Sequence, residues 1–242
     1  MSTGKLILVP SPIGNLDDIS LRAIQVLRSA DGILCEDTRH SGKLLKHHEI
    51  ENKLHPFHQH NEHKVTERWV GAMKGGSQLA LLTDAGTPGI SDPGYLLVHA
   101  AVASDIQVEV LPGATAFVPA VVASGLSCER FLYLGFPPQK KGRQTFWLGL
   151  AQQAYTMVMY ESPHRIQKAL AEAIEALGGD RHAAVVRELS KMHETYHRGS
   201  LVELKSIGEK QTYKGEIVLV IEGLKAYEKR LKNAGDDTNS EA

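Results

Sequence analysis

The chain has 242 residues, of which 42% are hydrophobic and 23% charged, and its formal net charge is −1. These values are typical of a soluble globular protein with one large or two moderate domains, and the charge argues against a strongly basic nucleic-acid-binding protein. The apolar run at the N-terminus is too short for a signal peptide, and no run approaches membrane-spanning length. Cys35 and Cys128 lie far apart among apolar neighbours, which indicates buried, reduced thiols and a cytoplasmic protein.

The first half of the chain alternates short apolar runs with helical patterns. Helices are expected after the caps Asp17, Asp18 and Ser20, with Leu21, Ile24 and Leu27 on one face, and from Glu36 to about residue 46. Further helices are expected over residues 62–73, 95–101 and 117–124, and strands over 6–9, 32–35, 55–57, 78–82 and 107–111. Such alternation predicts a mostly parallel sheet covered on both faces.

The second half predicts strands over residues 131–136, 156–160, 182–189, 194–200 and 216–221, and a helix over 164–177. The last two strands are expected to pair antiparallel. The predicted fold class is therefore α/β, with two domains: a mostly parallel sheet in residues 1–126 and a mixed sheet in residues 127–224. Residues 225–242 form a tail whose polar end, from about Ala234, is expected to be disordered.

Three irregular segments follow strands of the first domain, at residues 10–16, 84–94 and 112–116. The second of them, DAGTPGISDPG, is too rich in glycine and proline for a helix or a regular strand. Carboxyl ends of parallel strands meet at one sheet edge, where ligands bind, so we expect one cleft there. Its carboxylates and small residues suit a ligand with ribose hydroxyls and positive charge, and the dinucleotide and P-loop fingerprints are absent. A tight turn with helix-capping aspartates is the alternative.

Seven short motifs together resemble one known family. They are residues 9–16 (VPSPIGNL), 36–39 (EDTR), 84–94, 112–116 (PGATA), 161–165 (ESPHR), 187–191 (RELSK) with Glu194, and 214–216 (KGE). In this order, from residue 5 to about 223, they closely resemble the ribosomal RNA methyltransferases of the tetrapyrrole methylase superfamily. Relatives that methylate porphyrins carry a shorter Gly-Asp-Pro loop in place of residues 84–94.

The resemblance implies a homodimer whose two α/β domains hold S-adenosyl-L-methionine in the cleft between them. It also implies 2′-O-methylation of a cytidine ribose in the decoding region of 16S ribosomal RNA, within the small ribosomal subunit. By family loop position, the residues that would border the cofactor are Pro10, Asp84, Gly86, Ile90, Thr115 and Ala116 in the first domain, and Tyr160, Leu189 and Gly215 in the second.

A ribose hydroxyl is a poor nucleophile, and it gains from a base or from a nearby cation. The candidates are Glu188, Lys191 and Glu36. Their alternative roles are exposed ion pairs at a strand end for Glu188 and Lys191, and helix capping for Glu36.

Basic side chains outnumber acidic ones over residues 139–214, so the second half is the better candidate for contact with a polyanion. The residues expected to hold phosphates are Arg39, Arg165 and Arg187, together with Lys140, Lys141 and Arg143 of a basic loop. Phe136, beside that loop, is either a base-stacking residue or part of the core.

Six histidines fall within residues 47–63, but they share no regular ligand spacing and no cysteine joins them. We therefore expect no metal site, and instead a solvated surface or a local contact to RNA or to a dimer partner. Two other functions stay open on the sequence alone. A methylase of a small tetrapyrrole would have a closed apolar pocket, whereas a non-catalytic RNA-binding protein on the same fold would not bind the cofactor.

Overall fold

The computed structural model describes residues 4–239, with side chains described as far as Ala234. The chain divides into two compact units, Met1–Thr115 and Ala116–Ala242, each built around one five-stranded sheet. The elements of the first unit are β1 (Lys5–Val9), the 3₁₀ turn η1 (Leu16–Asp18), α1 (Leu21–Ser29), β2 (Gly32–Cys35), α2 (Thr38–His47), β3 (Leu54–Pro56), α3 (Glu62–Lys74), β4 (Gln78–Leu82), α4 (Tyr95–Val102) and β5 (Gln107–Val110).

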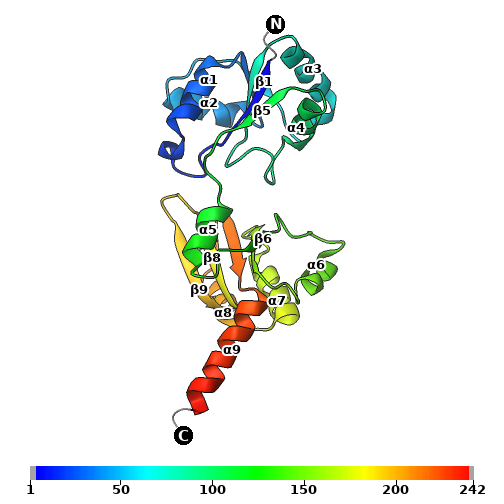
Figure 1. Cartoon of the computed structure of the whole chain (residues 1–242). Helices are drawn as coiled ribbons and strands as arrows, with labels where there is room; N and C mark the ends of the chain where they lie inside the picture. Colours follow the sequence, from blue (N-terminus) through cyan, green and yellow to red (C-terminus); the bar gives the residue numbers. More distant parts are fainter. Residues whose placement is uncertain (1–3, 240–242) are drawn as a thin grey trace. The chain divides into compact units, whose positions relative to one another are not determined.

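The first sheet has the strand order β3-β2-β4-β1-β5, and all four strand pairs are parallel. Alternate residues of β1 enter two cores: Ile7 and Val9 pack with α1 and α2, whereas Leu6 and Leu8 pack with α3 and α4. Figure 1 shows these helix pairs on opposite faces of the sheet. The doubly covered parallel sheet expected from the sequence is thus confirmed, and a sheet buried on both faces explains why its strands are apolar almost throughout.

Local capping explains where the first helices begin. The Ser20 side chain accepts a hydrogen bond from the backbone N–H of Ala23 at 3.1 Å, and Asp37 caps α2 in a similar way through Arg39 N. The expected apolar face of α1 is wrong at one position, because Leu21 is 80% exposed. Leu21 lies about 120° around the helix from buried Leu27, since six residues at 3.6 per turn do not return to the same face.

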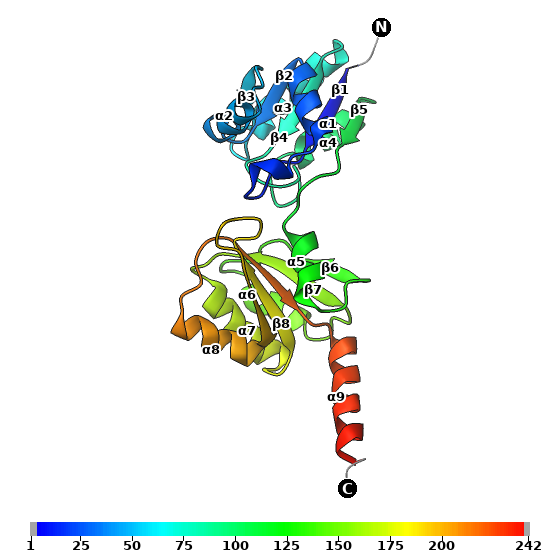
Figure 2. The same ribbon diagram turned by 90° about the vertical axis from the view of Figure 1, so that its left-hand side faces the viewer.

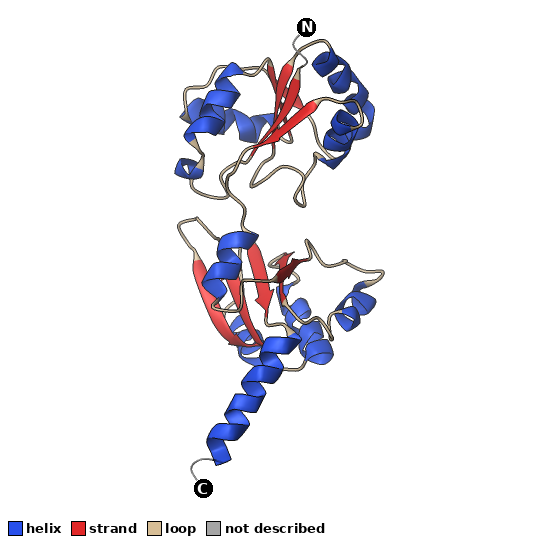
Figure 3. Ribbon diagram, in the orientation of Figure 1, coloured by secondary structure: helices blue, strands red, loops and turns tan. Residues whose placement is uncertain are grey.

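The second unit contains α5 (Phe117–Ser124), β6 (Phe131–Tyr133), α6 (Arg143–Gly149), β7 (Thr156–Glu161), α7 (Ile166–Leu177), β8 (His182–Arg187), β9 (Thr195–Ser200), α8 (Leu201–Lys210), β10 (Ile217–Ile221) and α9 (Leu224–Asn239). Its sheet is mixed, as expected, with the order β6-β7-β10-β8-β9 and one parallel pair, β6 with β7. One face packs against α6, α7 and α8, and the other contacts α5 (Figure 3). Helix α5 thus belongs to the second unit, whereas the sequence predicts a domain boundary after it.

The expected pairing of the last two strands is wrong. Strand β10 lies between β7 and β8 and pairs antiparallel with both, whereas β9 pairs only with β8. Burial explains the order, because every residue of β10 is buried, whereas no residue of β9 is buried, as expected of an edge strand.

Two further expectations are corrected. Helix α9 continues to Asn239, so the segment from Ala234 is helical that far, while residues 240–242 lie outside the described residues. Cys35 is buried as expected, but Cys128 is exposed. Among the described residues, no helix combines the length and apolar character that crossing a membrane requires.

Candidate active site

The three irregular segments of the first unit meet at the carboxyl edge of its sheet. Ser11 and Gly86 form a two-bond backbone bridge, with N–O distances of 2.8 and 2.9 Å, which joins the loops after β1 and β4. The Thr87 hydroxyl donates to the Ala114 carbonyl at 3.1 Å and joins the segment after β5. The sheet order places β1 between β4 and β5, so these loops emerge as neighbours.

Two glycines of the loop after β4 have conformations that other residues rarely adopt. Gly86 has φ +79° at the bridge to Ser11, and Gly94 has φ +135° at the start of α4. A Cβ on Gly94 would lie 3.0 Å from the Leu81 side chain, so both backbone strain and lack of space favour glycine there. The two glycines therefore fix the path of this loop.

Three carboxyl groups gather around this loop: Asp84, Glu36 and Asp92. Burial, followed by the charges of Glu36 and Asp84, raises the pKa of Asp92 to about 7. Burial and then the charge of Asp84 also raise the pKa of Glu36. Asp84 Oδ1 accepts the backbone N–H of Asp37 at 3.2 Å. Partly buried carboxylates that repel one another are stabilised by a cation, so this edge suits a positively charged ligand.

Two neighbouring groups help to define what this edge can do. The Thr83 hydroxyl, at the end of β4, is buried and has no hydrogen-bond partner within the described protein. A buried polar atom of this kind fits a site that a ligand completes. Burial raises the pKa of the Cys35 thiol, at the end of β2, to about 11, so this thiol stays protonated and is a poor nucleophile.

In the second unit, Glu188 and Lys191 form a compact group with Glu216. The Glu188 carboxylate accepts the Glu216 N–H at 2.8 Å and the Lys191 ammonium at 3.2 Å, and Lys191 also pairs with Glu216 at 3.1 Å. The Glu216 N–H, followed by Lys191, lowers the pKa of Glu188 despite some burial. Burial alone would lower the pKa of Lys191, but its two carboxylate partners outweigh it and raise that pKa. Glu188 is thus a carboxylate held by hydrogen bonds, and Lys191 a fixed cation.

Gly215 has a clear structural role in this group. Its φ is +79°, and a Cβ there would lie 2.2 Å from Cδ of Glu188. Glycine therefore lets the Glu188 carboxylate reach the Glu216 N–H. Leu189, another residue expected at the cofactor, is buried.

An aromatic group lies beside the basic loop of the second unit. The Tyr160 ring, on β7, is 5.5 Å from that of Tyr133 and 5.4 Å from that of Phe136. Phe136 is 54% exposed, which excludes the alternative that it is a core residue. Lys140 and Lys141 are also exposed, so this region presents cations near an accessible ring.

Arg143 does not match the expected contact with phosphate. Its side chain is 4% exposed and pairs with Glu161 at 3.3 Å and Glu172 at 2.6 Å, while Nη1 donates to the Pro138 carbonyl at 3.0 Å. Trp147 Nε1 donates to the same Glu172 carboxylate. The buried guanidinium thus joins the basic loop, through the Pro138 carbonyl, to Glu161 and Glu172. One signal of this burial is readable in the sequence, since Glu161 ends an apolar strand and a buried carboxylate needs a cation.

The other predicted phosphate ligands differ in accessibility. The Arg39 side chain is 88% exposed and pairs with Asp37 at 2.7 Å, and Arg165 pairs with Glu161 at 3.0 Å. Arg187 is half-buried and donates to the Lys214 carbonyl and to the Thr195 hydroxyl. Among these three, Arg39 is therefore the most accessible to a phosphate.

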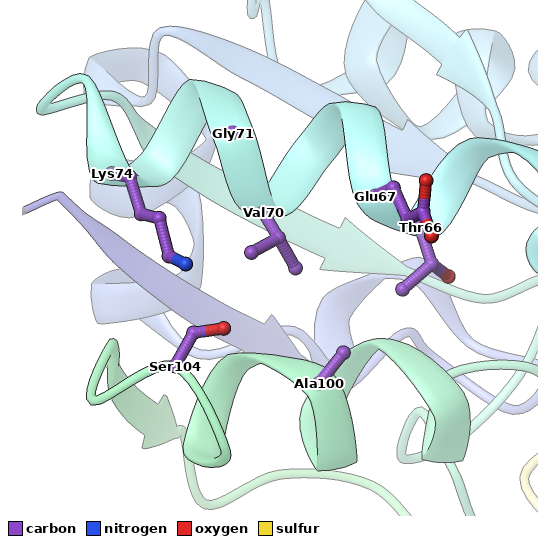
Figure 4. A pocket seen from close by; sticks show the side chains of 7 residues that line it. All are labelled: Thr66, Glu67, Val70, Gly71, Lys74, Ala100 and Ser104. Atoms are coloured by element: carbon purple, nitrogen blue, oxygen red, sulfur yellow. The ribbon is translucent and has the colours of Figure 1, made fainter.

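In the histidine-rich segment the ring of His47 contacts that of His48, the ring of His58 contacts that of His60, and the ring of His55 contacts Trp69. Within the described part of the chain, no group of three or more histidine, cysteine, aspartate or glutamate side chains is arranged so that it could hold a metal ion. A pocket of about 330 Å³ lies elsewhere in this unit, between α3 and α4 (Figure 4). This pocket is lined by residues of α3, of α4 and of the turn after α4, and none of them belongs to the three loops at the carboxyl edge of the sheet.

Comparison with known proteins agrees with this architecture. Residues 5–205 match the family model described as Tetrapyrrole (Corrin/Porphyrin) Methylases. The uroporphyrin-III-C-methyltransferase of Thermus thermophilus superimposes with a TM-score of 0.66, covering 94% of this chain and 98% of that one. It is 22% identical, so the likeness concerns the fold alone.

Two curated relatives are much more similar in sequence, and both carry the name ribosomal RNA small subunit methyltransferase I. The Synechocystis protein is 44% identical over 91% of this chain and 79% of its own length. The Pseudomonas aeruginosa protein is 42% identical over 94% of this chain and 82% of its own length. The chain therefore belongs to the tetrapyrrole methylase family, in the group of the ribosomal RNA small subunit methyltransferase I proteins.

Proposed function

We propose that this protein transfers a methyl group from S-adenosyl-L-methionine to the 2′-oxygen of a cytidine ribose in the decoding region of 16S ribosomal RNA. The names of relatives at 42–44% identity support a small-subunit ribosomal RNA substrate. The observation that carries the cofactor assignment is the set of repelling carboxyl groups, Glu36, Asp84 and Asp92, beside a glycine-shaped loop.

The carboxyl-edge loops fit this cofactor in both charge and shape. When bound, S-adenosyl-L-methionine supplies an electrophilic methyl group on a positively charged sulfur. Asp84 would accept hydrogen bonds from ribose hydroxyls, and the carboxylates together would compensate the positive charge. The backbone of Pro10, Gly86, Ile90, Thr115 and Ala116 would border the cofactor. Tyr160, Leu189 and Gly215 are the contacts proposed from the second unit.

Activation of the ribose hydroxyl requires a proton acceptor or a cation. Glu36 is a better proton acceptor than Glu188, because burial and the charge of Asp84 favour uptake of a proton by Glu36. Lys191, fixed by Glu188 and Glu216, would stabilise the developing oxyanion.

RNA would contact exposed groups of both units. Phe136 would stack on an unpaired base, and Lys140 and Lys141 would hold adjacent phosphates. Arg39, Arg165 and Arg187 are further proposed phosphate ligands. We also propose that the protein acts in the cytoplasm as a homodimer, as the family resemblance implies.

The test is methyl transfer from radiolabelled S-adenosyl-L-methionine to small ribosomal subunits purified from cells that lack this protein. We expect label in one 2′-O-methylated cytidine, located by nuclease digestion and mass spectrometry. Label on the base, or on another nucleotide, would refute the proposed specificity but keep the enzyme class. No label despite cofactor binding would favour a tetrapyrrole substrate, and loss of cofactor binding as well would favour a non-catalytic RNA-binding protein.

A further inference from the structure

A basic groove lies in the second unit where α9 leaves the sheet. It encloses about 720 Å³, and its lining comes from three segments: the chain before β6, the start of β7 and the first half of α9. Its basic residues are Arg130, Lys225, Lys229 and Arg230, against one acidic residue, Glu129. Figure 2 shows α9 extending from the end of β10 as a single rod that projects away from the sheet of the second unit.

The positive charge of this groove is largely uncompensated. Among the described side chains, Arg130, Lys225 and Lys229 form no ion pair with a carboxylate, whereas Arg230 pairs with Glu222 at 2.9 Å. Lys225 and Lys229 are exposed and lie one helical turn apart, where like charges repel. Three cations that form no ion pair with a described carboxylate, on one groove, favour an anionic ligand.

The groove also has an ordered aromatic wall. The Arg130 guanidinium lies 5.7 Å from the centre of the Tyr155 ring and donates to the Tyr155 hydroxyl at 3.1 Å. This contact holds Arg130 in place with donors left for a phosphate. Asn233 adds an amide at the next turn of α9. Such a row of cations and an amide along one helix matches a sugar-phosphate backbone better than a compact anion.

The groove is separate from the residues proposed to react. Tyr155 precedes β7, and Tyr160 lies near the other end of that strand, so the two ends are about 17 Å apart at 3.3 Å per residue. Lys191 and Glu188 follow β8 at the same sheet end as Tyr160, because Arg187 pairs with Ile217 and Ile217 with Glu161. A ligand in the groove therefore lies beyond the reach of a single nucleoside.

We infer that this groove, built on Arg130, Lys225 and Lys229, binds the phosphate backbone of the substrate RNA at a distance from the methylated nucleotide. The inference rests on the RNA methyltransferase function proposed above and extends it. It requires a substrate that is a folded RNA or an assembled subunit, large enough to span the second sheet.

The test compares the double variant Lys225→Gln, Lys229→Gln with the wild type in binding to small ribosomal subunits across a salt series. The association constant K falls as salt rises, and each lost phosphate contact should reduce the steepness of log K against log salt by about 0.9. At 0.15 M salt this corresponds to a roughly fivefold loss of affinity. For the two lost contacts of the double variant we therefore expect binding about 30-fold weaker than that of the wild type, and a salt dependence less steep by about 1.8. Glutamine is a good helix former, so α9 should persist.

A matched control keeps the change of charge but moves it to the first unit. Lys53→Gln with Lys74→Gln removes two exposed lysines that precede β3 and β4, and it should bind subunits within about twofold of the wild type. Affinity for S-adenosyl-L-methionine, measured by calorimetry, should be unchanged in both double variants.

The possible failures are distinguishable. If the wild type binds and methylates subunits but the groove variant matches it in affinity and slope, the inference is wrong, and an acidic protein surface becomes the ligand to examine. If the wild type itself neither binds nor methylates RNA, the proposed function fails and the inference fails with it.

Discussion

Asp92 offers a direct test of the carboxyl cluster through the pH dependence of stability. Its pKa is raised from 3.8 to about 7, first by burial and then by Glu36 and Asp84. A raised pKa in an acid means that the folded protein holds a proton which the unfolded chain releases. Between about pH 4 and pH 7 the unfolded state therefore gains stability, and the folded state loses it progressively as the pH rises.

The size of the effect follows from the shift. Three pKa units correspond to about 4 kcal/mol, at 1.36 kcal/mol per unit, as an upper limit. Because the Asp92 side chain is half-buried, solvent screening should reduce this to about 2 kcal/mol. Asp92→Asn keeps the shape of the side chain and removes its charge. The free energy of unfolding of the variant minus that of the wild type should therefore increase by about 2 kcal/mol between pH 4 and pH 8.

The assay must separate the two units, and the positions of the two tryptophans allow this. Trp69 is buried in the first unit and Trp147 in the second. Urea unfolding followed by 19F NMR of fluorotryptophan therefore reports each unit, and only the Trp69 transition should move. Asp105→Asn, at an exposed position of the first unit, is the control. A difference between Asp92→Asn and the wild type that stays constant from pH 4 to pH 8 would refute the assigned cause.

Three further predictions concern the two units separately. Asp84→Ala should weaken S-adenosyl-L-methionine binding at least tenfold in calorimetry, because a charged hydrogen bond contributes about 1.5–3 kcal/mol; unchanged affinity would remove the site from this edge. Gly215→Ala places a Cβ 2.2 Å from Cδ of Glu188, at a position whose φ is positive. The second unit should therefore be destabilised by about 2 kcal/mol or more, measured by thermal unfolding. An unchanged Tm would contradict the strain. Phe136→Ala should raise the KM for subunits without changing cofactor affinity, whereas Leu148→Ala, at a similarly exposed position, should do neither.

The sequence predicted the first unit better than the second for a physical reason. In a doubly covered parallel sheet each strand is a short apolar run, and β4 was predicted with the bounds that the structure has, Gln78–Leu82. The order of strands in the mixed sheet depends on pairing between distant segments, which periodicity does not report. The continuous burial of β10 was the available signal, since a strand that is apolar at every position belongs in the centre of a sheet.

Three helices of the second unit, α6, α8 and α9, were not predicted, although two of them carry a readable signal in the sequence. Helix α8 begins with a capping box, in which Ser200 and Glu203 bond reciprocally, and this spacing is readable in the sequence. In α9, Leu224, Tyr227 and Leu231 have helical spacing, but the polar end of the segment obscured it. The burial of Arg143 was harder to predict, because its partners Glu161 and Glu172 are distant in the sequence.

The surroundings of the two acidic candidates for catalysis, Glu36 and Glu188, shift their pKa values in opposite directions. A carboxylate acts well as a general base when its surroundings favour the protonated form over the charged form. Protonation of Glu188 would weaken its bonds to the Glu216 N–H and to Lys191, and its pKa is lowered accordingly. Protonation of Glu36 instead relieves its repulsion with Asp84 and the cost of burying its charge. We therefore propose that Glu188 positions Lys191 and that Glu36 accepts the proton, so the pH dependence of methyl transfer should follow the protonation of Glu36.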